Sequence, residues 1–546
     1  MGMTMTQKIL AKHAGLDEVK AGQLIEANLD LVLGNDVTAP VAIGEMKKMN
    51  VDCVFCKDKI ALVPDHFTPN KDIKSAELYK CVKDFAEENQ ITNYFETGRV
   101  GIEHALLPEK GLVVAGDVVI GADSHTCTYG ALGAFGTGVG CTDFLYGMVT
   151  GQSWVLVPES VKFNLIGELP EGVYARDLIL TIIGQVGANG CNYQVMEFTG
   201  EGAKTLSISD RIALCNMAVE AGAKTGIFEA DEKAMEYLKE HGREPKAVFH
   251  SDPDAHYIRE YTIDLSKVEP VVAKPDFVDN LSPAKEVRGI KIDEAFLGSC
   301  NNGRIEDLRV GAEVIKGKKV ADKVRFLVVP ASQTIYRQAL KEGLLDIFME
   351  AGAIVMNPNC SVCWGSCQGV IGENEVLIST GTRNFKGRAG NPNAKIYLVS
   401  PESAAATAIM GTFASAADIL GDQIDILAEV HEKEEDEIND NLIIKPLPEE
   451  EAKKVEIVRG PNIKFLPVPE VPVQHLKVPV SLKGGDNIST DDITPASAEF
   501  SSMRSNIPLM SKYCYYRYDT EFSERAREMG SSIIIGGENY GQGSSR

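Results

Sequence analysis

Short apolar runs rich in β-branched residues alternate with longer segments of helical periodicity along most of the chain. Apolar runs of four or five residues predict buried strands. These runs occupy 59–63, 118–121, 325–329, 353–356, 376–379, 395–399 and 532–536. The segments 175–187, 210–222 and 334–351 have apolar residues at helical spacing and predict helices. Alternation of strands and helices is typical of parallel sheets, so we predict an α/β fold.

This alternation breaks once, towards the C-terminal end. Residues 431–458 are rich in acidic side chains, and residues 461–474 contain four prolines. Neither stretch can bury enough apolar surface to fold alone, and both compositions are typical of extended spacers. We therefore expect a linker at 426–475 and a further α/β unit at 476–546.

A chain of 546 residues is too long for one hydrophobic core, because domains usually hold roughly 100–200 residues. Its formal charge of −23 repels the phosphates of nucleic acids and disfavours nucleic-acid binding. The sequence contains neither an apolar stretch long enough to span a bilayer nor the pattern of a secretory signal. We therefore expect a cytoplasmic protein whose twelve cysteines remain thiols or bind metal.

Reactive side chains follow several of the apolar runs. Asp65-His66, Asp123-Ser124-His125 and Cys360 begin two to four residues after the runs at 59–63, 118–121 and 353–356, and Cys300 follows a further run, EAFL (294–297). In parallel sheets ligands bind beyond the carboxyl ends of the strands. These groups can therefore converge on one crevice.

Three cysteines, Cys300, Cys360 and Cys363, form a candidate metal site. Cys360 and Cys363 are separated by two residues in a Gly- and Asn-rich turn, where two thiolates can face one ion or cluster. Cys367 is a candidate fourth ligand, and four cysteines would make a closed, structural zinc site. Three protein ligands would instead leave a coordination position open for substrate.

Three histidines are candidates for proton transfer: His66, His104 and His125. Their expected carboxylate partners are Asp65, Asp123 and Glu197. A carboxylate fixes the tautomer of its histidine and raises its basicity, which suits proton transfer to a leaving oxygen. A single histidine is more often structural, but two of the nine lie in Asp-His or Asp-Ser-His runs at strand ends, which favours catalysis.

Four arginines are candidates for binding an anionic substrate: Arg383, Arg388, Arg504 and Arg546. Arginine binds carboxylates in a bidentate manner, although each arginine taken alone is more often a surface ion-pair residue. The Gly-rich segment 536–546 follows a predicted strand and is expected to present backbone N–H groups to an anion. It lacks the Walker A pattern, which disfavours nucleotide binding.

Together these motifs resemble the hydro-lyases of the aconitase superfamily. The matching runs are PDH (64–66), GIEH (101–104), GADSHT (121–126), GVGCTD (138–143), VMEFTG (195–200), GSCNNGRIEDLR (298–309), NCSVCWG (359–365), TRNFKGR (382–388), DNISTDDITPA (486–496) and GENYGQGSSR (537–546). They cover nearly the whole chain in the expected order. This combination is far more specific than a pair of cysteines.

The resemblance implies three α/β domains around a [4Fe-4S] cluster, followed by a swivel domain on a long linker. It places the first two domains at 1–285, the third at 286–425, the linker at 426–475 and an incomplete swivel domain at 476–546. Cys300, Cys360 and Cys363 would hold the cluster, and Cys367 would not be a ligand. Iron–sulfur assembly machinery would be a partner of such a protein.

The same resemblance implies roles for individual residues. Ser544 would take the proton from carbon, and His66, supported by Asp65, would protonate the departing hydroxyl. His104 with Asp123, and His125 with Glu197, would orient water and hydroxyl. The carboxylates of the substrate would be held by Arg383, Arg388, Arg504 and Arg546. Further substrate contacts are expected at Asn35, Ser124, Asp491, Thr494 and Ser545.

Within the superfamily we expect an aconitate hydratase of the tricarboxylic acid cycle, with a small tricarboxylate or dicarboxylate substrate. The N-terminal part resembles the isopropylmalate and homoaconitate dehydratases, which remain the alternative. The run ISTDDITPAS and the presence of both parts in one chain favour aconitate hydratase. Asn35 and Thr382 depart from the residues usual in the family. Relatives continue beyond the position of Arg546, so we expect a truncated swivel domain.

Two interpretations from other classes remain open. An iron-responsive RNA-binding regulator is disfavoured by the charge of −23 and by the lack of a basic patch. A zinc-stabilised interaction protein leaves the histidines and arginines unexplained.

Overall fold

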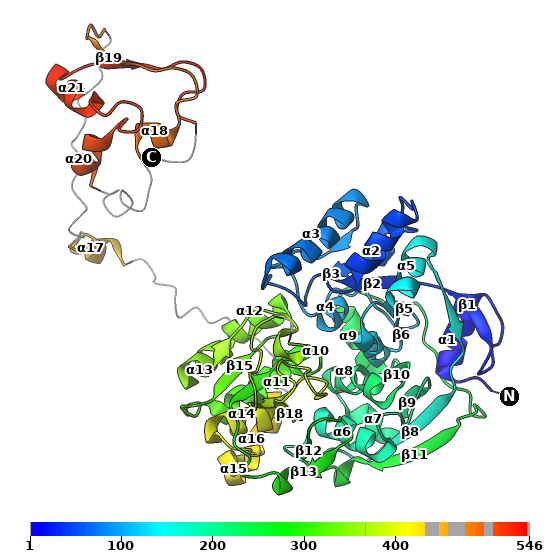
Figure 1. Cartoon of the computed structure of the whole chain (residues 1–546). Coiled ribbons are helices and arrows are strands. Elements are labelled where there is room, and N and C mark those ends of the chain that lie inside the picture. The colour runs from blue at the N-terminus through cyan, green and yellow to red at the C-terminus, as the bar shows by residue number, and fades with distance from the viewer. Residues whose placement is uncertain (1, 366, 432–446, 457–474, 496–505, 543–546) are drawn as a thin grey trace. The chain divides into compact units, whose positions relative to one another are not determined.

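The computed structural model describes the whole chain except residues 1, 366, 432–446, 457–474, 496–505 and 543–546 (Figure 1). The chain divides into two compact units, Met1–Asn439 and Asp440–Arg546. The first unit contains three parallel or mostly parallel sheets, and each unit is described by itself.

The first sheet has five parallel strands in the order β4-β3-β2-β5-β6. The strands are β2 (Leu31–Asn35), β3 (Ile60–Val63), β4 (Asn93–Tyr94), β5 (Val118–Gly121) and β6 (Phe135–Gly138). The helices beside this sheet are α2 (Ala39–Lys48), α3 (Ile73–Glu88) and α5 (Cys141–Thr150) (Figure 1). Every residue of β2, β3 and β5 is buried, as expected for apolar strands covered on both faces.

The second sheet has four parallel strands in the order β10-β9-β8-β11. The strands are β8 (Ser160–Ile166), β9 (Val195–Thr199), β10 (Thr225–Phe228) and β11 (Arg259–Asp264). Phe163 and Phe198 project from one face into a core with helices α6 (Ala175–Val186) and α8 (Ile208–Asn216). Side chains alternate along a strand, so Lys162 and Glu197 belong to the opposite face.

The third sheet has seven strands in the order β13-β12-β18-β17-β14-β15-β16, and is parallel from β18 to β16. The strands are β12 (Val271–Ala273), β13 (Leu281–Pro283), β14 (Glu294–Leu297), β15 (Arg325–Val328), β16 (Ile354–Val355), β17 (Val376–Ser379) and β18 (Lys395–Leu398). Its helices are α11 (Ile305–Ile315), α12 (Gln333–Lys341), α13 (Leu344–Ala351) and α14 (Pro401–Met410). They bury one continuous apolar core with the strands.

Shorter elements complete the first unit. The helices are α1 (Met5–Ala14), α4 (Glu103–Glu109), α7 (Glu201–Thr205), α9 (Glu232–Glu240), α10 (Ser299–Asn302), α15 (Ala416–Leu420) and α16 (Ile426–His431). The 3₁₀ segments that matter for the site are η2 (Ser124–Leu132), η3 (Ala218–Ala221) and η6 (Ser361–Cys363). Strands β1 (Leu24–Asn28) and β7 (Gln152–Leu156) form a separate antiparallel pair.

Two backbone contacts join the loops of the first sheet to those of the third. Gly101 and Ser332 form an isolated bridge, and a Cβ atom at Gly101 would lie 2.7 Å from the Ser332 Cβ. The amide of Cys360 also donates to the carbonyl of Asp65, with a separation of 3.0 Å. The loops at the ends of the first and third sheets are therefore in direct contact.

The α/β prediction is confirmed, and each predicted strand is present within one residue or two of its expected limits. Two predicted helices are divided. The segment 334–351 breaks at Gly343, whose φ of +73° is a left-handed conformation that ends one helix before the next begins. The segment 210–222 ends as a helix at Asn216 and continues as η3. The first residues of the expected linker, 426–431, form α16, and Leu427 is buried there.

The second unit contains two parallel strands, β19 (Val480–Lys483) and β20 (Ile533–Ile535). Its helices are α17 (Glu449–Ala452), α18 (Thr490–Ile493), α20 (Ile507–Met510) and α21 (Phe522–Met529). A small core of Leu482, Ile488, Tyr515 and Phe522 holds this unit together. All three residues of β20 are exposed.

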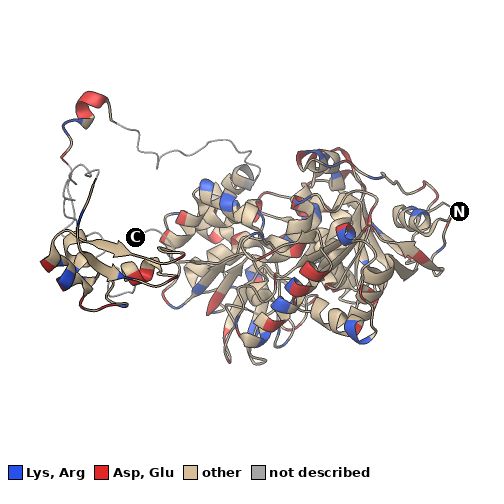
Figure 2. Ribbon diagram, turned by 90° about the horizontal axis from the view of Figure 1, so that it is seen from above, with Lys and Arg blue, Asp and Glu red and all other residues tan. Residues whose placement is uncertain are grey.

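Charged side chains of both signs are interspersed along the helices of the first unit in the view of Figure 2. Within the described residues, no helix combines the length and the apolar character that crossing a membrane requires.

Candidate active site

A cavity of about 210 Å³ lies where loops of the first and third sheets meet. The residues that line it are Asn35, Val37, Thr38, Asp65, His66, Ile102, Glu103, His104, Ala122, Asp123, Ser124, His125, Cys300, Cys360, Cys363, Trp364, Thr382, Arg383 and Arg388. Most of the reactive groups expected from strand ends are in this set. The carboxyl ends of β3, β5 and β14 do converge, as a parallel sheet arrangement predicts.

His66 follows β3 and is held from both sides. Its Nδ1 lies 2.6 Å from Oδ1 of Asp65, and its backbone amide donates to Asp36 at 3.0 Å. The Trp364 ring meets the imidazole edge to face, with centroids 5.3 Å apart. Burial alone would lower the pKa of His66, but the charges of Asp65, Asp123 and Asp36 raise it to about 9. The imidazole is therefore charged and positioned to donate a proton.

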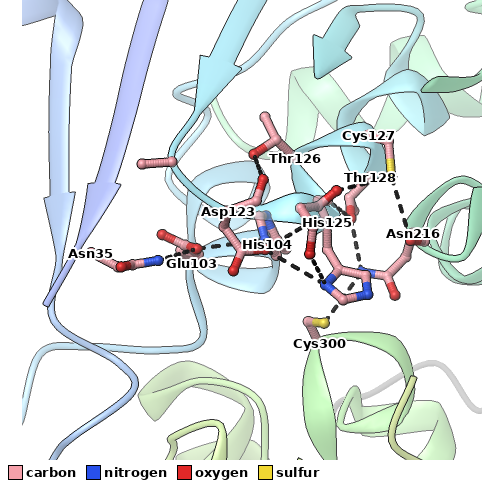
Figure 3. Close-up of polar contacts among 12 residues, drawn as sticks. Asn35, Glu103, His104, Asp123, His125, Thr126, Cys127, Thr128, Asn216 and Cys300 are labelled. Atoms are coloured by element: carbon pink, nitrogen blue, oxygen red, sulfur yellow. Dashed lines mark hydrogen bonds and ion pairs between the residues drawn. The ribbon is translucent and has the colours of Figure 1, made fainter. Parts of the chain in front are cut away.

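His104 and His125 share the carboxylate of Asp123 (Figure 3). Nε2 of His104 lies 2.8 Å from Oδ1 of Asp123, and Nδ1 lies 3.2 Å from the Tyr129 hydroxyl. Asp123 is also the N-cap of η2 and accepts from the His125 amide at 2.8 Å. Burial would raise the pKa of Asp123, but hydrogen bonds from the two histidines hold it well below its usual range. Asp123 therefore stays ionised and orients both rings.

Glu197 does not pair with His125, which corrects one expectation from the sequence. Nε2 of His125 lies 3.1 Å from Oε1 of Glu220 on η3. Glu197 lies on β9, in a different sheet, and accepts from Ser251 and Tyr257 at 2.6 and 2.5 Å. The alternation of side chains along β9 directs Glu197 away from the cavity that contains His125.

Glu220 also binds one of the candidate arginines. Nε of Arg383 donates to the same Oε1 atom at 2.7 Å. Burial alone would raise the pKa of Glu220, but the hydrogen bond from His125 and the charge of Arg383 keep it below its usual value. Arg388 is anchored differently, because its Nε donates to the carbonyl of Cys363 at 2.8 Å. Both guanidinium groups line the cavity and can meet a carboxylate there.

Asn35 and Ser124 line the same cavity but already have partners. The Asn35 side-chain oxygen accepts from Thr38 at the start of α2, and its Nδ2 donates to Oε1 of Glu103 at 3.2 Å. Oγ of Ser124 lies 3.5 Å from Nδ1 of His125. Burial, followed by the charges of nearby aspartates, raises the pKa of Glu103 well above its usual value. This shift favours the protonated form of Glu103.

The three candidate cluster ligands lie together. Cys300 is on α10 after β14, and Cys360 and Cys363 flank the turn of η6. Burial raises the pKa of Cys300 well above its usual value, and the charge of Cys363 raises it further. Asn216 donates to Sγ of Cys300 at 3.3 Å (Figure 3). Thr382 lies 3.8 Å from Sγ of Cys363.

This donor set fits an iron–sulfur cluster. Three thiols line one cavity, and all twelve cysteines are free thiols. Cys367 does not line that cavity, and its Sγ lies 3.7 Å from the carbonyl of Thr68. The described residues therefore do not form a closed four-cysteine zinc site. Three thiols beside acid and base groups instead leave room for a ligand.

The remaining expected site residues belong to the second unit. Asp491 lies on α18 and Thr494 is the C-cap of that helix. Four residues fall outside the described part of the chain: Arg504, Ser544, Ser545 and Arg546. Their expected roles stay predictions.

The sequence interpretation missed Glu220, Glu103, Asn216 and Trp364. Glu220 precedes β10, at the amino end of a strand, so a search of carboxyl ends could not find it. Asn216 is the last residue of α8 and reaches Cys300 from a different sheet layer. Glu103 and Trp364 could have been found from the sequence, because Glu103 is adjacent to the candidate His104 and Trp364 is adjacent to the candidate Cys363.

Relatives that are more than half identical cover about three quarters of the chain. The chain is 56% identical over 420 residues to the 3-isopropylmalate dehydratase large subunit of Clostridium kluyveri, which covers 77% of this chain and 100% of that protein. It is 58% identical over 415 residues to the protein of the same name from Acetivibrio thermocellus, with 76% and 99% covered. The holo-form crystal structure of Thermococcus kodakaraensis aconitase X is 14% identical, with a TM-score of 0.40 over 78% of this chain and 95% of its own.

These relatives correct the expected activity. The expectation of an aconitate hydratase of the tricarboxylic acid cycle is wrong, because several relatives more than half identical are named 3-isopropylmalate dehydratase large subunit. The expectation gave weight to the run ISTDDITPAS, which belongs to the second unit. The cavity is formed by the first unit.

The family model described as "Aconitase family (aconitate hydratase)" matches residues 7–411. This range contains every residue that lines the cavity. The resemblance found in the sequence motifs is thereby confirmed. The chain is a hydro-lyase and belongs to the aconitase family.

Proposed function

We propose that this chain is the catalytic large component of a 3-isopropylmalate dehydratase. Such an enzyme removes a hydroxyl group and a proton from adjacent carbons as water and returns water in the opposite orientation. The identity of 56–58% to large subunits of that name supports this activity. The observation that carries the proposal is the meeting of three thiols, a buried charged histidine and two arginines in one cavity.

Cys300, Cys360 and Cys363 are the residues that would hold a [4Fe-4S] cluster. Such a cluster would supply Lewis-acid chemistry in this cavity. Asn216 donates a hydrogen bond to Cys300, which favours the thiolate form that metal binding requires.

His66 is the proposed acid. Asp65 holds its Nδ1 at 2.6 Å, which leaves Nε2 facing the cavity side, 3.8 Å from Asp123. In the charged form Nε2 donates a proton to the departing hydroxyl, and in the reverse direction it takes that proton back. Neighbouring carboxylates keep the charged form populated.

Arg383 and Arg388 are the proposed binding groups for the two carboxylates of the substrate. Among the described residues, each forms its hydrogen bond to the protein through Nε, Arg383 to Glu220 and Arg388 to the carbonyl of Cys363. The terminal nitrogens of a guanidinium can then bind a carboxylate in a bidentate manner.

A small-subunit component is the proposed partner, because the relatives are named large subunits. The second unit is the candidate for that component within this chain. By resemblance Ser544 would take the proton from carbon, while Arg504, Arg546 and Ser545 would bind the substrate. The expected contacts from Asp491 and Thr494 belong to the same proposal.

The test is a substrate comparison with protein reconstituted with iron and sulfide. The 3-isopropylmalate reaction should proceed at least about 100-fold faster in kcat/KM than those of citrate and homocitrate, a gap of about 2.7 kcal/mol. Addition of a separately expressed small subunit tests whether the second unit suffices. The proposal fails if citrate or homocitrate is the preferred substrate in both preparations.

The variant His66→Asn tests the role of His66 as the acid. It should lower kcat by about 10²–10⁴-fold, because a positioned proton donor contributes that much, while iron content stays unchanged. His241→Asn is the control, since His241, the C-cap residue of α9, contacts the carbonyl of Tyr237 and does not line the cavity. Equal activity in the two variants would contradict the role of His66.

A further inference from the structure

A second cavity, larger than the first, lies beside the four-stranded sheet. Its volume is about 370 Å³, compared with about 210 Å³ for the candidate active site. It is lined by residues of all four strands, β8 to β11, of helices α7 and α8, of the segment 251–257 and of the start of α1. The two cavities have no lining residue in common. It is therefore a separate feature of the first unit.

Glu197 is the central group of this cavity. Its side chain is almost completely buried, with 1% of the residue exposed. Oε1 accepts from the hydroxyls of Ser251 and Tyr257, at 2.6 and 2.5 Å. Oε2 has no hydrogen-bond partner among the described residues. A buried carboxylate oxygen without a donor is unfavourable, so a ligand that brings an N–H donor would be stabilised here.

Two further polar atoms of the same cavity lack a partner within the described structure. They are Oγ1 of Thr199, two residues after Glu197 on β9, and Nε of Arg211. Arg211 is only 1% exposed, and its terminal nitrogens are occupied by Asp231 at 2.6 and 2.7 Å. Three incomplete hydrogen-bonding groups in one cavity indicate a polar occupant rather than an apolar one.

The charges of the cavity favour a cationic group next to Glu197. Five lining residues are carboxylates and three are Lys or Arg. Glu197 and Glu260 flank Lys162 in register on adjacent strands, and Nζ of Lys162 lies 3.5 Å from Glu260. The excess of carboxylates would repel an anion, whereas an ammonium group would complete the pairing.

One cation of the cavity is unpaired. Lys204, on α7, is exposed and has no hydrogen bond or ion pair within the described part of the chain. It follows Glu197 closely in sequence and lines the same cavity. The lining thus includes one buried carboxylate and one exposed, unpaired ammonium group.

We propose that this cavity is a binding site for a free α-amino acid. The ammonium group of the ligand donates to Oε2 of Glu197, and its carboxylate meets Lys204. Phe198, Phe228 and Ala203 provide an apolar lining for a side chain. The volume is near the lower end for small-molecule pockets, which suits a ligand of this size. The site is independent of the proposed dehydratase activity.

The test is a binding measurement on the full-length, cluster-containing protein. The twenty standard amino acids are screened by thermal shift, and the best binder is titrated by calorimetry. Its decarboxylated amine and its deaminated acid are titrated in parallel, so that for L-valine these are isobutylamine and isovalerate. We expect the amino acid to bind, and each analogue to lose about tenfold or more in affinity, as expected for one charged hydrogen bond.

Two variants and a control locate the site. Glu197→Gln should weaken binding by about tenfold or more, and Lys204→Ala should weaken it by about fivefold or more. Lys204 is exposed, so the second variant tests the site without disturbing the core. Glu201→Gln is the control, because Glu201 is exposed on the same short helix but does not line the cavity. Its affinity should be unchanged.

Several results would overturn the proposal. One is the absence of any amino-acid binding up to about 10 mM, which would mean that water alone satisfies the three polar atoms. Another is binding of the deaminated acid as tightly as the amino acid. A third is competition between the amino acid and the dehydratase substrate, which would place the ligand in the other cavity.

Discussion

Nε of Arg383 donates to Oε1 of Glu220 at 2.7 Å, and that same oxygen lies 3.1 Å from Nε2 of His125. One buried carboxylate therefore orients both a candidate substrate-binding group and a candidate water-orienting group. Because Glu220 is 6% exposed, neither partner can exchange it easily for solvent. The expected acid of the sequence interpretation, Glu197, has no part in this arrangement.

Glu220→Gln should weaken the contacts of residue 220 with Arg383 and His125 while keeping a side chain of nearly the same size and shape. The amide cannot carry the charge that holds Arg383, so about 1.5–3 kcal/mol of charged hydrogen bonding is lost. We expect kcat/KM to fall by about 10- to 100-fold, with unchanged iron and sulfide content. Glu201→Gln, an exposed residue, is the control. Unaltered kinetics in Glu220→Gln would contradict the role given to Glu220.

Removal of any one thiol should abolish cluster binding. Cys300→Ser, Cys360→Ser and Cys363→Ser each leave two ligands, which are too few to hold a [4Fe-4S] cluster. Cys367→Ser and Cys53→Ser should retain it, because neither residue lines the cavity. Iron and labile sulfide analyses, with the visible absorbance, measure the outcome. Stoichiometric iron in Cys363→Ser would disprove the ligand assignment.

Arg388→Lys should impair substrate binding more than it impairs the cluster. A lysine is a point charge that cannot form a bidentate pair, and it also loses the bond to the Cys363 carbonyl. We expect KM to rise and kcat/KM to fall by about 10- to 100-fold, from a loss of about 1.5–3 kcal/mol. Arg337→Lys, at an exposed site on α12, is the matched control. Equal kinetic constants for the two variants would exclude contact between Arg388 and substrate.

The stability of the first unit should fall as the pH rises from about 5 to about 8, in part because of Glu402. This residue, in the first turn of α14, is 1% exposed. Burial, and then the charge of Asp177, raises its pKa from 4.5 to about 8. The native state thus keeps a proton that the unfolded chain releases above pH 4.5, so stability is highest below that value and decreases up to the folded pKa.

Glu402→Gln should reduce that loss, because the amide is neutral at every pH. The difference between the two proteins should reach on the order of 1–3 kcal/mol at pH 8.5 and vanish near pH 5. Thermal unfolding midpoints measured across this range test it, with Glu350→Gln, an exposed residue of α13, as the control. Parallel pH profiles of wild type and Glu402→Gln would show that Glu402 is ionised in the native state.

The strands were the most predictable part of the fold. Apolar β-branched runs such as 118–121 and 376–379 are buried on both faces, so composition and burial agree. Helix ends were less predictable, because the break at Gly343 depends on a left-handed conformation that an apolar periodicity does not reveal. The start of the linker was predicted from composition alone, which does not show that 426–431 form a helix with Leu427 buried.

The candidate site was predictable where a strand leads directly into it. Asp65, His66 and Asp123 follow β3 and β5, and Cys300 follows β14. The partner of His125 was not predictable, because pairing across sheets depends on tertiary distance. Glu197 and Glu220 are both acids near strands, and only the direction of each side chain distinguishes them. The expected activity was wrong because a motif of the second unit, and the presence of both parts in one chain, were given more weight than the N-terminal motifs that resemble the dehydratases.

The hydrogen bond from the Cys360 amide to the Asp65 carbonyl has a consequence for biosynthesis. These two residues stand far apart in the sequence, and a contact between them closes a long loop of chain. Residues 360–363 must therefore be synthesised and leave the ribosome before the proposed acid and the three thiols can line one cavity. Metal loading would then follow folding, and a nascent chain that ends before this turn would carry Cys300 without the other two ligands.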